Sequence, residues 1–515
     1  MNNLPPYTLG LAPDEAQARF EMLQTRLVPL WRSIRALNQD PQTIVVVPSF
    51  SLDLPLGGAV LQAYEERYLF LLLLLRQPRA RLIYVTSQPI LQEIVDYYLH
   101  LLPGVIASQA RQRLFLVSPM DGSPRPLSEK LLERPPLLSQ LRSLILDHNR
   151  AHLVPFITTQ LERDLALALD IPMYGADPKF FPFGTKSGCR QLFAEEGVKH
   201  PLGAENLHTE QEVIAALAGL RAQRPGLRQV VVKHNEGVSG FGNAIIDLQA
   251  LPAPGDAAEQ PGLAERLRAM RFENDSISFD WYMQTLAAHG GIAEERILGD
   301  EFRSPSAQLR ITPLGEVELL STHDQLLGGP SGQTYLGAVF PADADYAARI
   351  MHEAAKVGRR LGKEGVLGRF AIDFVAVRSQ GSAWDVFAIE LNLRKGGTTH
   401  PFLTLQFLTD GAYDAGKGVF TTPFGQQKCF IASDHVASPL FRVFTHADLF
   451  ELVALHGLHF DQARQTGIVL HMISALGESG SFGLTAVANS HAEARALYER
   501  AVTAFESEAR QRLGG

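Results

Sequence analysis

The chain has 515 residues, of which 46% are hydrophobic and 20% charged, and its formal net charge is −8. That length exceeds what one hydrophobic core usually serves, so we expect two to four domains. No run of Lys or Arg offers a basic surface for nucleic acid or a polybasic anchor for a membrane. We therefore expect neither nucleic acid nor a membrane as a partner.

Targeting signals are also absent from the pattern. Residues 1–13 lack a basic region followed by an apolar core, so no signal peptide is expected. The longest apolar run, residues 69–75, is far shorter than the roughly 20 residues of a membrane span, and a buried helix face explains it better. Cys189 and Cys429 are too few for a disulfide framework. These observations favour a cytoplasmic protein.

Short β-branched runs alternate with helical periods in the first third of the chain. This alternation predicts right-handed βαβ units around a parallel sheet, an α/β, Rossmann-like layout. The expected strands cover residues 44–47, 81–86, 113–117 and 152–157, and the expected helices residues 62–76, 90–102 and 128–148. Glu65, Glu66 and Arg67 are expected on a helix surface. Residues 48–53 lack the glycine fingerprint of dinucleotide sites, so NAD binding is not expected.

A new pattern begins at Gly184 and continues to the C-terminus. Thr209 and Glu212 have capping-box spacing, as do Ser490 and Glu493 at the start of a helix towards Arg512. Residues 251–262 are expected to form a surface loop. Further expected helices cover residues 185–197 and 346–361, and further strands residues 230–233, 307–311, 317–321, 370–377 and 386–392.

The strand expected at residues 230–233 ends in Lys233 and leads into a glycine-rich segment, residues 234–243. Glycines let backbone N–H groups approach phosphate oxygens, and the lysine supplies a positive charge. This arrangement suits a polyphosphate site. A β-hairpin with a glycine turn and a surface lysine would explain the stretch equally well.

A second feature combines two neighbouring strands. Arg369 and Asp373 share one face of the first strand, and Glu390, Asn392 and Arg394 share one face of the next. Pairing these strands would gather carboxylate and amide oxygens, the ligands that Mg²⁺ prefers, next to two guanidinium groups suited to anions. The alternative is a solvated strand pair with cross-strand ion pairs. It is less favoured because the residues between them, Phe370, Ile372, Phe374 and Ile389, indicate a buried opposite face.

A third feature is the acidic turn around Glu294, Glu295 and Glu301. Its backbone could face a purine edge and a carboxylate could accept from ribose hydroxyls, but an acidic surface turn explains it better when it is taken alone.

Taken in order, these features resemble the ATP-grasp superfamily across about residues 184–400. The resemblance implies that Asp373, Glu390 and Asn392 bind metal and that Lys233 contacts phosphate. It also implies further residues of an ATP site. A lid loop would contain Glu236, Ser239 and Gly240, and the adenine hinge would contain Glu294 and Glu295. Glu301 would contact the ribose, and either Lys186 or Arg190 would make a second phosphate contact.

The flanking segments resemble a more specific group. The N-terminal part is similar to a pre-ATP-grasp domain, and residues 455–472 resemble the C-terminal domain of peptide ligases similar to the pheganomycin ligase. The domains expected are a Rossmann-like unit (1–183), a two-lobed ATP-grasp unit (184–425, divided at about 290/291) and a small α+β C-terminal domain (426–515).

This resemblance implies an ATP-dependent carboxylate–amine ligase that uses Mg²⁺, with Mn²⁺ as an alternative ion. Arg369 and Arg394 would hold the donor carboxylate and then the acyl phosphate, and the amine of an amino acid or peptide would displace phosphate. The alternative is an ATP-grasp phosphotransferase acting on a small metabolite. Oligomeric state stays open, with a homo-oligomer as one option.

Several other residues are less decisive. Residues 322–325 are placed either to line an acceptor pocket or to form a self-satisfied turn. Residues 398–401 follow the metal strand and are expected to touch substrate. His456, His459 and His471 are expected to be structural histidines rather than a metal site.

Overall fold

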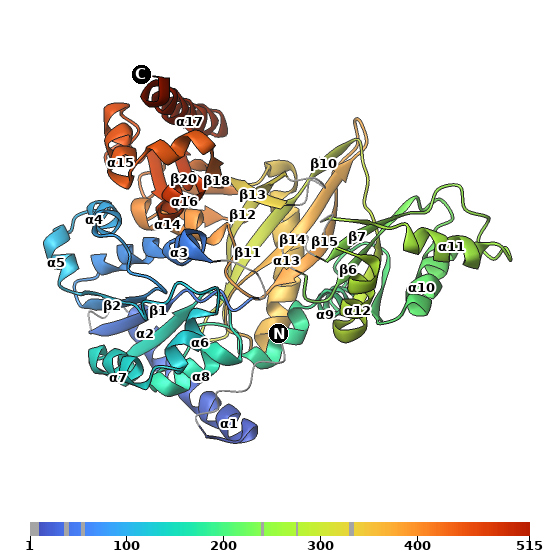
Figure 1. The fold of residues 1–515 in the computed structure, drawn as a ribbon, viewed down its shortest axis with the longest axis horizontal. Helices are drawn as coiled ribbons and strands as arrows, with labels where there is room; N and C mark the ends of the chain where they lie inside the picture. Colours follow the sequence, from blue (N-terminus) through green and yellow to red (C-terminus); the bar gives the residue numbers. More distant parts are fainter. Residues whose placement is uncertain are drawn as a thin grey trace.

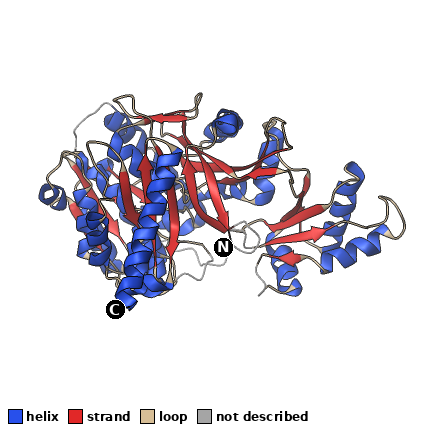
Figure 2. Ribbon diagram, turned by 90° about the horizontal axis from the view of Figure 1, so that it is seen from above, coloured by secondary structure: helices blue, strands red, loops and turns tan. Residues whose placement is uncertain are grey.

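The computed structural model describes residues 10–35, 41–52, 57–237, 242–273, 277–328 and 334–514. The N-terminal unit and the C-terminal segment lie together on one side of a central antiparallel sheet, and a small lobe projects from the other side (Figure 1). Figure 2 shows the same lobe standing apart from the main body. The central sheet therefore lies between the small lobe on one side and the N-terminal unit with the C-terminal segment on the other.

The N-terminal unit is built on a four-stranded parallel sheet in the order β3-β2-β1-β4. Its strands are β1 (Gln42–Val47), β2 (Ala80–Val85), β3 (Leu114–Val117) and β4 (Ala151–Pro155). The expected strands and the Rossmann-like layout are confirmed. Its helices are α1 (Pro13–Gln24), α2 (Leu27–Arg35), α3 (Gly58–Glu66), α4 (Gln92–His100), α5 (Ala107–Arg111), α6 (Leu127–Leu132), α7 (Pro135–Leu144) and α8 (Gln160–Leu169), with 3-10 turns η1 (Leu69–Arg76) and η2 (His148–Arg150).

Two expected helices of this unit are each divided. The helix expected at residues 128–148 is wrong as a single element, because Pro135 begins a new helix and cannot donate the backbone hydrogen bond that would continue the first. The helix expected at residues 62–76 ends at Glu66 and resumes as η1. Almost all of η1 is buried, as expected for the apolar run.

The expectation of a surface at Glu65, Glu66 and Arg67 is wrong, because all three side chains are buried. Glu65 accepts from the Ser87 amide at 2.6 Å, and Glu66 accepts from the Ile473 amide at 2.7 Å. Burial raises the pKa of both carboxyls to about 7. These hydrogen bonds satisfy the buried groups, and those of Glu66 join the N-terminal unit to the C-terminal segment.

The small lobe carries a five-stranded sheet in the order β5-β9-β6-β7-β8. Thr209 and Glu212 form the expected capping box. The loop expected at residues 251–262 is shorter than predicted, because helix α11 begins at Glu259. The lobe contains β5 (Gly203–Leu207), β6 (Gln229–His234), β7 (Asn243–Asp247), β8 (Arg271–Phe272), β9 (Gly291–Glu295), α10 (Glu210–Gln223), α11 (Glu259–Arg268) and α12 (Phe279–His289), preceded by η3 (Pro178–Gly184) and α9 (Lys186–Glu195).

A nine-stranded sheet forms the centre of the molecule, with β15 paired to β14 beside the path β10-β14-β11-β12-β13-β18-β20-β19. Its strands are β10 (Glu301–Arg303), β11 (Pro305–Ile311), β12 (Val317–Gly328), β13 (Thr334–Phe340), β14 (Gly368–Arg378), β15 (Asp385–Asn392), β18 (Cys429–Ala437), β19 (Gly467–His471) and β20 (Ser481–Ala488). Helices α13 (Ala344–Glu364) and α14 (Thr399–Thr409) and a hairpin of β16 (Ala412–Asp414) and β17 (Val419–Thr421) accompany it. The last three strands in the order come from the C-terminal segment.

The C-terminal segment is therefore continuous with the central sheet, since β18 pairs with β13. One hydrophobic core also joins Leu72 of η1, Phe402 of α14, and Leu470 and Phe505 of the C-terminal segment. The remaining elements are α15 (His446–Leu455), α16 (Leu476–Ser479), α17 (His491–Gly514), η4 (Pro439–Val443) and η5 (Ile473–Ala475). The domain boundaries at 183/184 and 425/426 stay predictions.

The second predicted capping box is present in part. Ser490 accepts from the Glu493 amide at 3.2 Å, whereas the Glu493 carboxylate accepts from the Asn489 amide, one residue before the expected donor. Among the described residues, no helix combines the length and hydropathy needed to span a bilayer.

Candidate functional site

A cavity of about 820 Å³ opens where the small lobe, the central sheet and the N-terminal unit meet. It is lined by Lys186 and Lys233 from the small-lobe side, and by Asp373, Glu390 and Arg394 from β14, β15 and the turn after β15. Most of the polar residues singled out in the sequence thus come to one place, although Lys233 and Asp373 are 140 residues apart in the chain.

The predicted strand pairing is present. Asp373 lies opposite Glu390 in the antiparallel register of β14 and β15, and Ala371 lies opposite Asn392. The Asn392 Nδ2 donates to Asp373 Oδ2 at 3.0 Å, and Gln325 Nε2 donates to Asp373 Oδ1 at 2.8 Å. The three predicted metal ligands therefore line the same cavity.

The two carboxyls differ in their electrostatic surroundings. Burial and the neighbouring Glu390 raise the pKa of Asp373 to about 6. Burial alone would raise the pKa of Glu390, but Lys186 at 2.5 Å, Arg394 and Lys233 hold that pKa below its ordinary value. A cation between them would relieve the repulsion on Asp373, so the donor set fits a hard divalent ion.

Lys186 and Arg190, the two candidates for the second phosphate contact, lie in different surroundings. Thr185 caps helix α9 and directs Lys186 to the cavity, where its Nζ lies 2.5 Å from Glu390. Arg190, one turn later, contacts Glu205 and Glu294 at 2.7 Å each and does not line the cavity. Of the two, the geometry favours Lys186 as the phosphate contact.

Lys233 lines the same cavity as Asp373 and Glu390. Its Nζ lies 2.6 Å from Glu294 Oε1, and its side chain is 11% exposed. The glycine-rich segment after it is described only in part. Glu236 lies 3.5 Å from His289 and does not line the cavity, and the predicted lid residues Ser239 and Gly240 lie outside the described residues.

Residues of the acidic turn line the cavity, but the carboxylates of the turn form ion pairs. Residues 294–299 line the cavity, but the Glu294 carboxylate lies between Lys233 and Arg190. Glu295 accepts from the Leu202 amide at 2.9 Å. Glu301 does not line the cavity, and it forms two hydrogen bonds with Arg378 at 2.7 and 2.9 Å. The Glu294 and Glu301 carboxylates are engaged in ion pairs, so the ribose role of Glu301 stays a prediction without support from this geometry.

Of the two arginines predicted to hold the substrate, only one lines the cavity. Arg394 lines the cavity, and its guanidinium carbon lies 6.0 Å from the ring centroid of Phe156. Arg369 does not line the cavity. It lies opposite Arg310 in the sheet, and burial together with Arg310 lowers its pKa to about 10. A shared strand face does not bring it to Asp373, because four residues of a strand span about 13 Å.

Some lining residues were not singled out in the sequence. Phe156 comes from the N-terminal unit, Tyr335 from β13 and Asp434 from β18. Arg67, expected on a surface, also lines the cavity. No local signal marks these positions, because only the packing of distant segments brings them together.

The less decisive sequence candidates have different outcomes. Gln325 and Thr398 line the cavity, whereas His323 is fully buried beside Ser321 at 2.8 Å. His471 lies in a buried cluster with His400 and Asp434, which His456 and His459 do not join.

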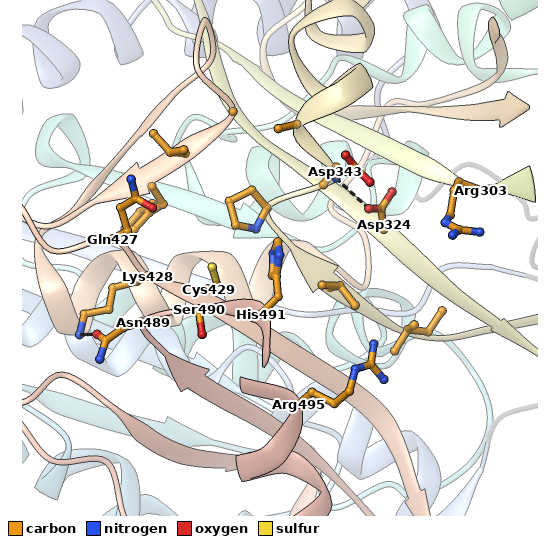
Figure 3. Close-up of a pocket in the computed structure, with 18 of the residues that line it drawn as sticks. Arg303, Asp324, Asp343, Gln427, Lys428, Cys429, Asn489, Ser490, His491 and Arg495 are labelled. Atoms are coloured by element: carbon orange, nitrogen blue, oxygen red, sulfur yellow. Dashed lines mark hydrogen bonds between the residues drawn. The ribbon is translucent and has the colours of Figure 1, made fainter. Parts of the chain in front are cut away.

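A second cavity, of about 760 Å³, lies between β12, β13, β18 and the start of α17 (Figure 3). Its labelled polar side chains include Asp324, which accepts from the Asp343 amide at 2.9 Å, and Lys428, which donates to Asn489 at 2.8 Å (Figure 3). Of the sequence candidates at residues 322–325, Asp324 and Gln325 line it, whereas none of the described residues predicted to bind metal, nucleotide or the donor carboxylate does.

Family models match two parts of the chain. Residues 181–260 and 257–416 match the family described as IQCH-like, ATP-grasp, and residues 448–501 match the PGM1 C-terminal domain. The chain is 29% identical over 447 residues to the L-propargylglycine–L-glutamate ligase of Streptantibioticus cattleyicolor, covering 85% of this chain and 88% of the relative. It is 24% identical over 428 residues to IQ motif-containing protein H of Danio rerio, covering 74% of this chain but 39% of that longer protein.

Solved structures support the same architecture. The biotin carboxylase–β,γ-ATP complex from Campylobacter jejuni superposes with a TM-score of 0.51 at 12% sequence identity, covering 90% of this chain and 91% of that one. At that identity the likeness concerns the fold alone. The mixed α/β fold class is confirmed.

Proposed function

We propose that the chain is an ATP-dependent ligase of the ATP-grasp type, which joins a carboxylate to an amine through an acyl phosphate. The observation that carries this proposal is the placement of Arg394 in the same cavity as Asp373, Glu390 and Asn392. A guanidinium group beside a carboxylate-rich metal site suits a substrate carboxylate, since its two parallel N–H donors match two carboxyl oxygens.

The nucleotide side of the proposal uses the small lobe and the acidic turn. Lys186 and Lys233 would contact the phosphates, and the backbone of residues 296–299 would meet the adenine edge. In this proposal Glu294 holds Lys233 in place through their 2.6 Å ion pair rather than contacting the nucleotide.

Asp373, Glu390 and Asn392 would hold Mg²⁺, with Mn²⁺ as the alternative. A bound divalent ion would neutralise the negative charge of the nucleotide phosphates. The chain's own residues do the rest: Arg394 orients the donor carboxylate, and Lys186 and Lys233 counter the phosphate charge. The cavity walls limit access of water to the reacting groups.

In the reaction, a donor carboxylate oxygen bonds to the γ-phosphorus and the bond to ADP breaks. The acceptor amine then bonds to the acyl carbon, the carbon–oxygen bond to phosphate breaks, and the amine proton leaves with the phosphate. The products are an amide, ADP and phosphate. Because the relative's name specifies two amino acids, we propose amino acids or short peptides as substrates.

The test uses purified protein with ATP and Mg²⁺, first with L-glutamate and L-propargylglycine and then with pools of amino acids. Products are read by mass spectrometry and the nucleotide by chromatography. An amide formed with ADP supports the proposal. A stable phosphorylated metabolite with no amide under any amine would replace it with a phosphotransferase, and AMP with pyrophosphate would replace the acyl phosphate with an adenylate.

A further inference from the structure

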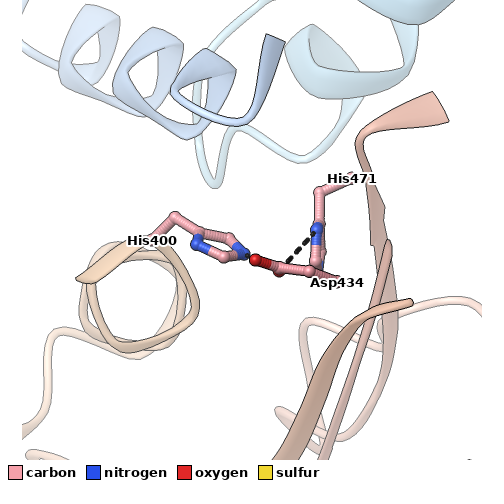
Figure 4. Close-up of side chains that lie close together, drawn as sticks. All are labelled: His400, Asp434 and His471. Carbon is pink, nitrogen blue, oxygen red and sulfur yellow. Dashed lines mark ion pairs between the residues drawn. The ribbon is translucent and has the colours of Figure 1, made fainter. Parts of the chain in front are cut away.

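A buried polar cluster adjoins the end of the cavity away from the small lobe. It consists of Arg67 at the end of α3, His400 in α14, Asp434 in β18 and His471 in β19. Figure 4 shows the side chains of His400 and His471 converging on Asp434 from the helix and from the central sheet. Arg67 and Asp434 line the cavity, whereas His400 and His471 lie behind Asp434.

Asp434 is the centre of the cluster. Its Oδ2 lies 2.9 Å from Arg67 NH1, and its Oδ1 lies 3.3 Å from His400 Nε2 and 3.7 Å from His471 Nδ1. The side chains of Arg67 and Asp434 are only 5% and 4% exposed. Burial would raise the pKa of Asp434, but hydrogen bonding to His400 and the positive charge of Arg67 hold it far below its ordinary range, so the carboxylate is charged.

Polar atoms without a partner gather in the same place. Among the described residues, Arg67 Nε, Tyr68 Oη and His400 Nδ1 are all buried and have no hydrogen-bond partner. Buried polar atoms are nearly always hydrogen-bonded, so the network around Asp434 lacks partners. Of these three residues Arg67 lines the cavity, so a polar ligand in the cavity can complete its part of the network.

The net charge of the cluster indicates which kind of ligand can bind beside it. Burial lowers the pKa of His400 and His471, so both are neutral, and Asp434 with Arg67 sums to zero. A divalent metal on the histidines and Asp434 would leave two positive charges in a buried site, which is strongly unfavourable. A zwitterionic amino acid adds one charge of each sign and leaves the site neutral.

The cluster is also placed to serve the proposed reaction. The Phe156 ring centroid lies 5.6 Å from the Arg67 guanidinium and 6.0 Å from that of Arg394, so both arginines lie beside the same aromatic ring. Arg394 would hold the activated donor. The Arg67 end is the neighbouring space in the same cavity, where an attacking amine must come from.

We propose that Asp434 and Arg67 form the acceptor subsite, in which Asp434 binds the ammonium group and Arg67 the carboxylate of an α-amino acid. The two charges of such a substrate sit on one carbon atom, which matches an Asp and an Arg in direct contact. His400 and His471 are positioning residues that hold Asp434. This inference rests on the proposed ligase function and gives the C-terminal segment, which supplies Asp434, a direct part in it.

The test compares two acceptors on one activated donor. Hydroxylamine is small and needs no charged subsite, so it reports acyl phosphate formation as a hydroxamate, whereas an amino acid acceptor reports the subsite. Asp434→Asn keeps the shape of the side chain and removes its charge. Its KM for the amino acid should rise at least about tenfold, while hydroxamate formation stays within about threefold of the parent.

A matched control is available in Asp410→Asn, because Arg76 and Asp410 form another Arg–Asp pair, at 2.8 Å, that joins the N-terminal unit to α14 but does not line the cavity. This control should leave both reactions unchanged. If Asp434→Asn does not fold, as judged by thermal unfolding, Arg67→Lys keeps the charge but loses the fork geometry and should raise the same KM.

The outcomes are distinct. Parent-like KM values for amino acids in folded Asp434→Asn or Arg67→Lys would overturn the subsite. Equal loss of hydroxamate and peptide in the variants would also overturn it, since that indicates damage to activation. A parent enzyme that makes no hydroxamate with any amino acid donor would instead overturn the ligase proposal.

Discussion

Asp373 and Glu390 stand directly opposite each other on β14 and β15, yet the pKa of one is raised to about 6 while that of the other is lowered. Lys186 and Arg394 lower the pKa of both carboxyls, but Lys186 pairs directly with Glu390 at 2.5 Å, whereas at Asp373 burial and the negative charge of Glu390 outweigh them. Carboxyls in one cavity whose pKa values are shifted in opposite directions are common at functional sites. The pair is therefore the first place to test the proposed site.

Glu390→Ala should reduce ATP turnover by at least about a hundredfold, because it removes a proposed metal ligand and leaves Lys186 without its partner. The side chain faces the cavity rather than a packed core, so the thermal unfolding midpoint should change little. ADP release measured with saturating Mg²⁺ and substrates checks this.

Glu318→Ala is the matched control, because Glu318 lies in the same sheet on β12, pairs with Arg310 and does not line the cavity. It should keep parent activity. Turnover by Glu390→Ala close to that of Glu318→Ala would show that the metal site has been assigned to the wrong residues.

Lys233→Ala should weaken ATP binding at least about tenfold, equivalent to about 1.4 kcal/mol, since a buried cation near the phosphates would be lost. Glu294 would keep Arg190 as a partner, so the fold should survive. Calorimetric titration with ATP checks this, with Lys199→Ala as the control because Lys199 is exposed and pairs with Asp385. Equal affinities in the two variants would contradict the phosphate role.

Glu66 gives a prediction on stability. It is buried and accepts hydrogen bonds from the Ile473 and Ser474 amides, at 2.7 and 2.9 Å. Glu66→Gln replaces one acceptor oxygen by a donor that faces those amides, and should cost about 1–3 kcal/mol. Thermal unfolding below pH 5 should show this cost most fully.

The pH dependence of that cost follows from the pKa of Glu66, raised by burial from 4.5 to about 7. Between these values the unfolded chain has lost the Glu66 proton while the folded chain keeps it, so the parent loses stability as pH rises through the window. Glu66→Gln has no proton to lose there. The difference in unfolding midpoint between the parent and the variant should shrink from pH 5 to pH 7, and a constant difference would mean that Glu66 is not protonated in the folded protein.

Structural features that depend on a short stretch of sequence, such as the face of a strand on which a side chain lies, could be predicted. The alternation of residues in β14 and β15 brought Asp373, Glu390 and Asn392 to one face, and the strand ending in Lys233 reaches the same cavity. Strand periodicity, however, shows only on which face of a strand a side chain lies, and not how far along the strand it lies from the cavity. It placed Arg369 on the face of Asp373 without revealing that four residues along the strand take it out of the cavity.

Features that depend on distant packing could not be predicted. Glu66 and Arg67 follow a helical pattern that looks exposed, and only the arrival of residues 434 and 473–474 buries them. The pairing of β18 with β13 is equally long-range, and no local pattern shows that the C-terminal segment continues the central sheet.

The two arginines of the predicted site provide the last test, because the structure treats them differently. Arg394 lines the cavity, whereas Arg369 lies beside Arg310 and Tyr174 and does not line it. With a donor, ATP and hydroxylamine, Arg394→Ala should lower hydroxamate formation at least about tenfold, because the carboxylate loses its bidentate partner. Arg369→Ala should keep most of that activity and instead lower the unfolding midpoint, since it leaves a gap beside half-buried Tyr174. The reverse pattern, with Arg369→Ala inactive and Arg394→Ala active, would move the donor carboxylate to the Arg369 end of β14 and remove the main support for the proposed arrangement of substrates.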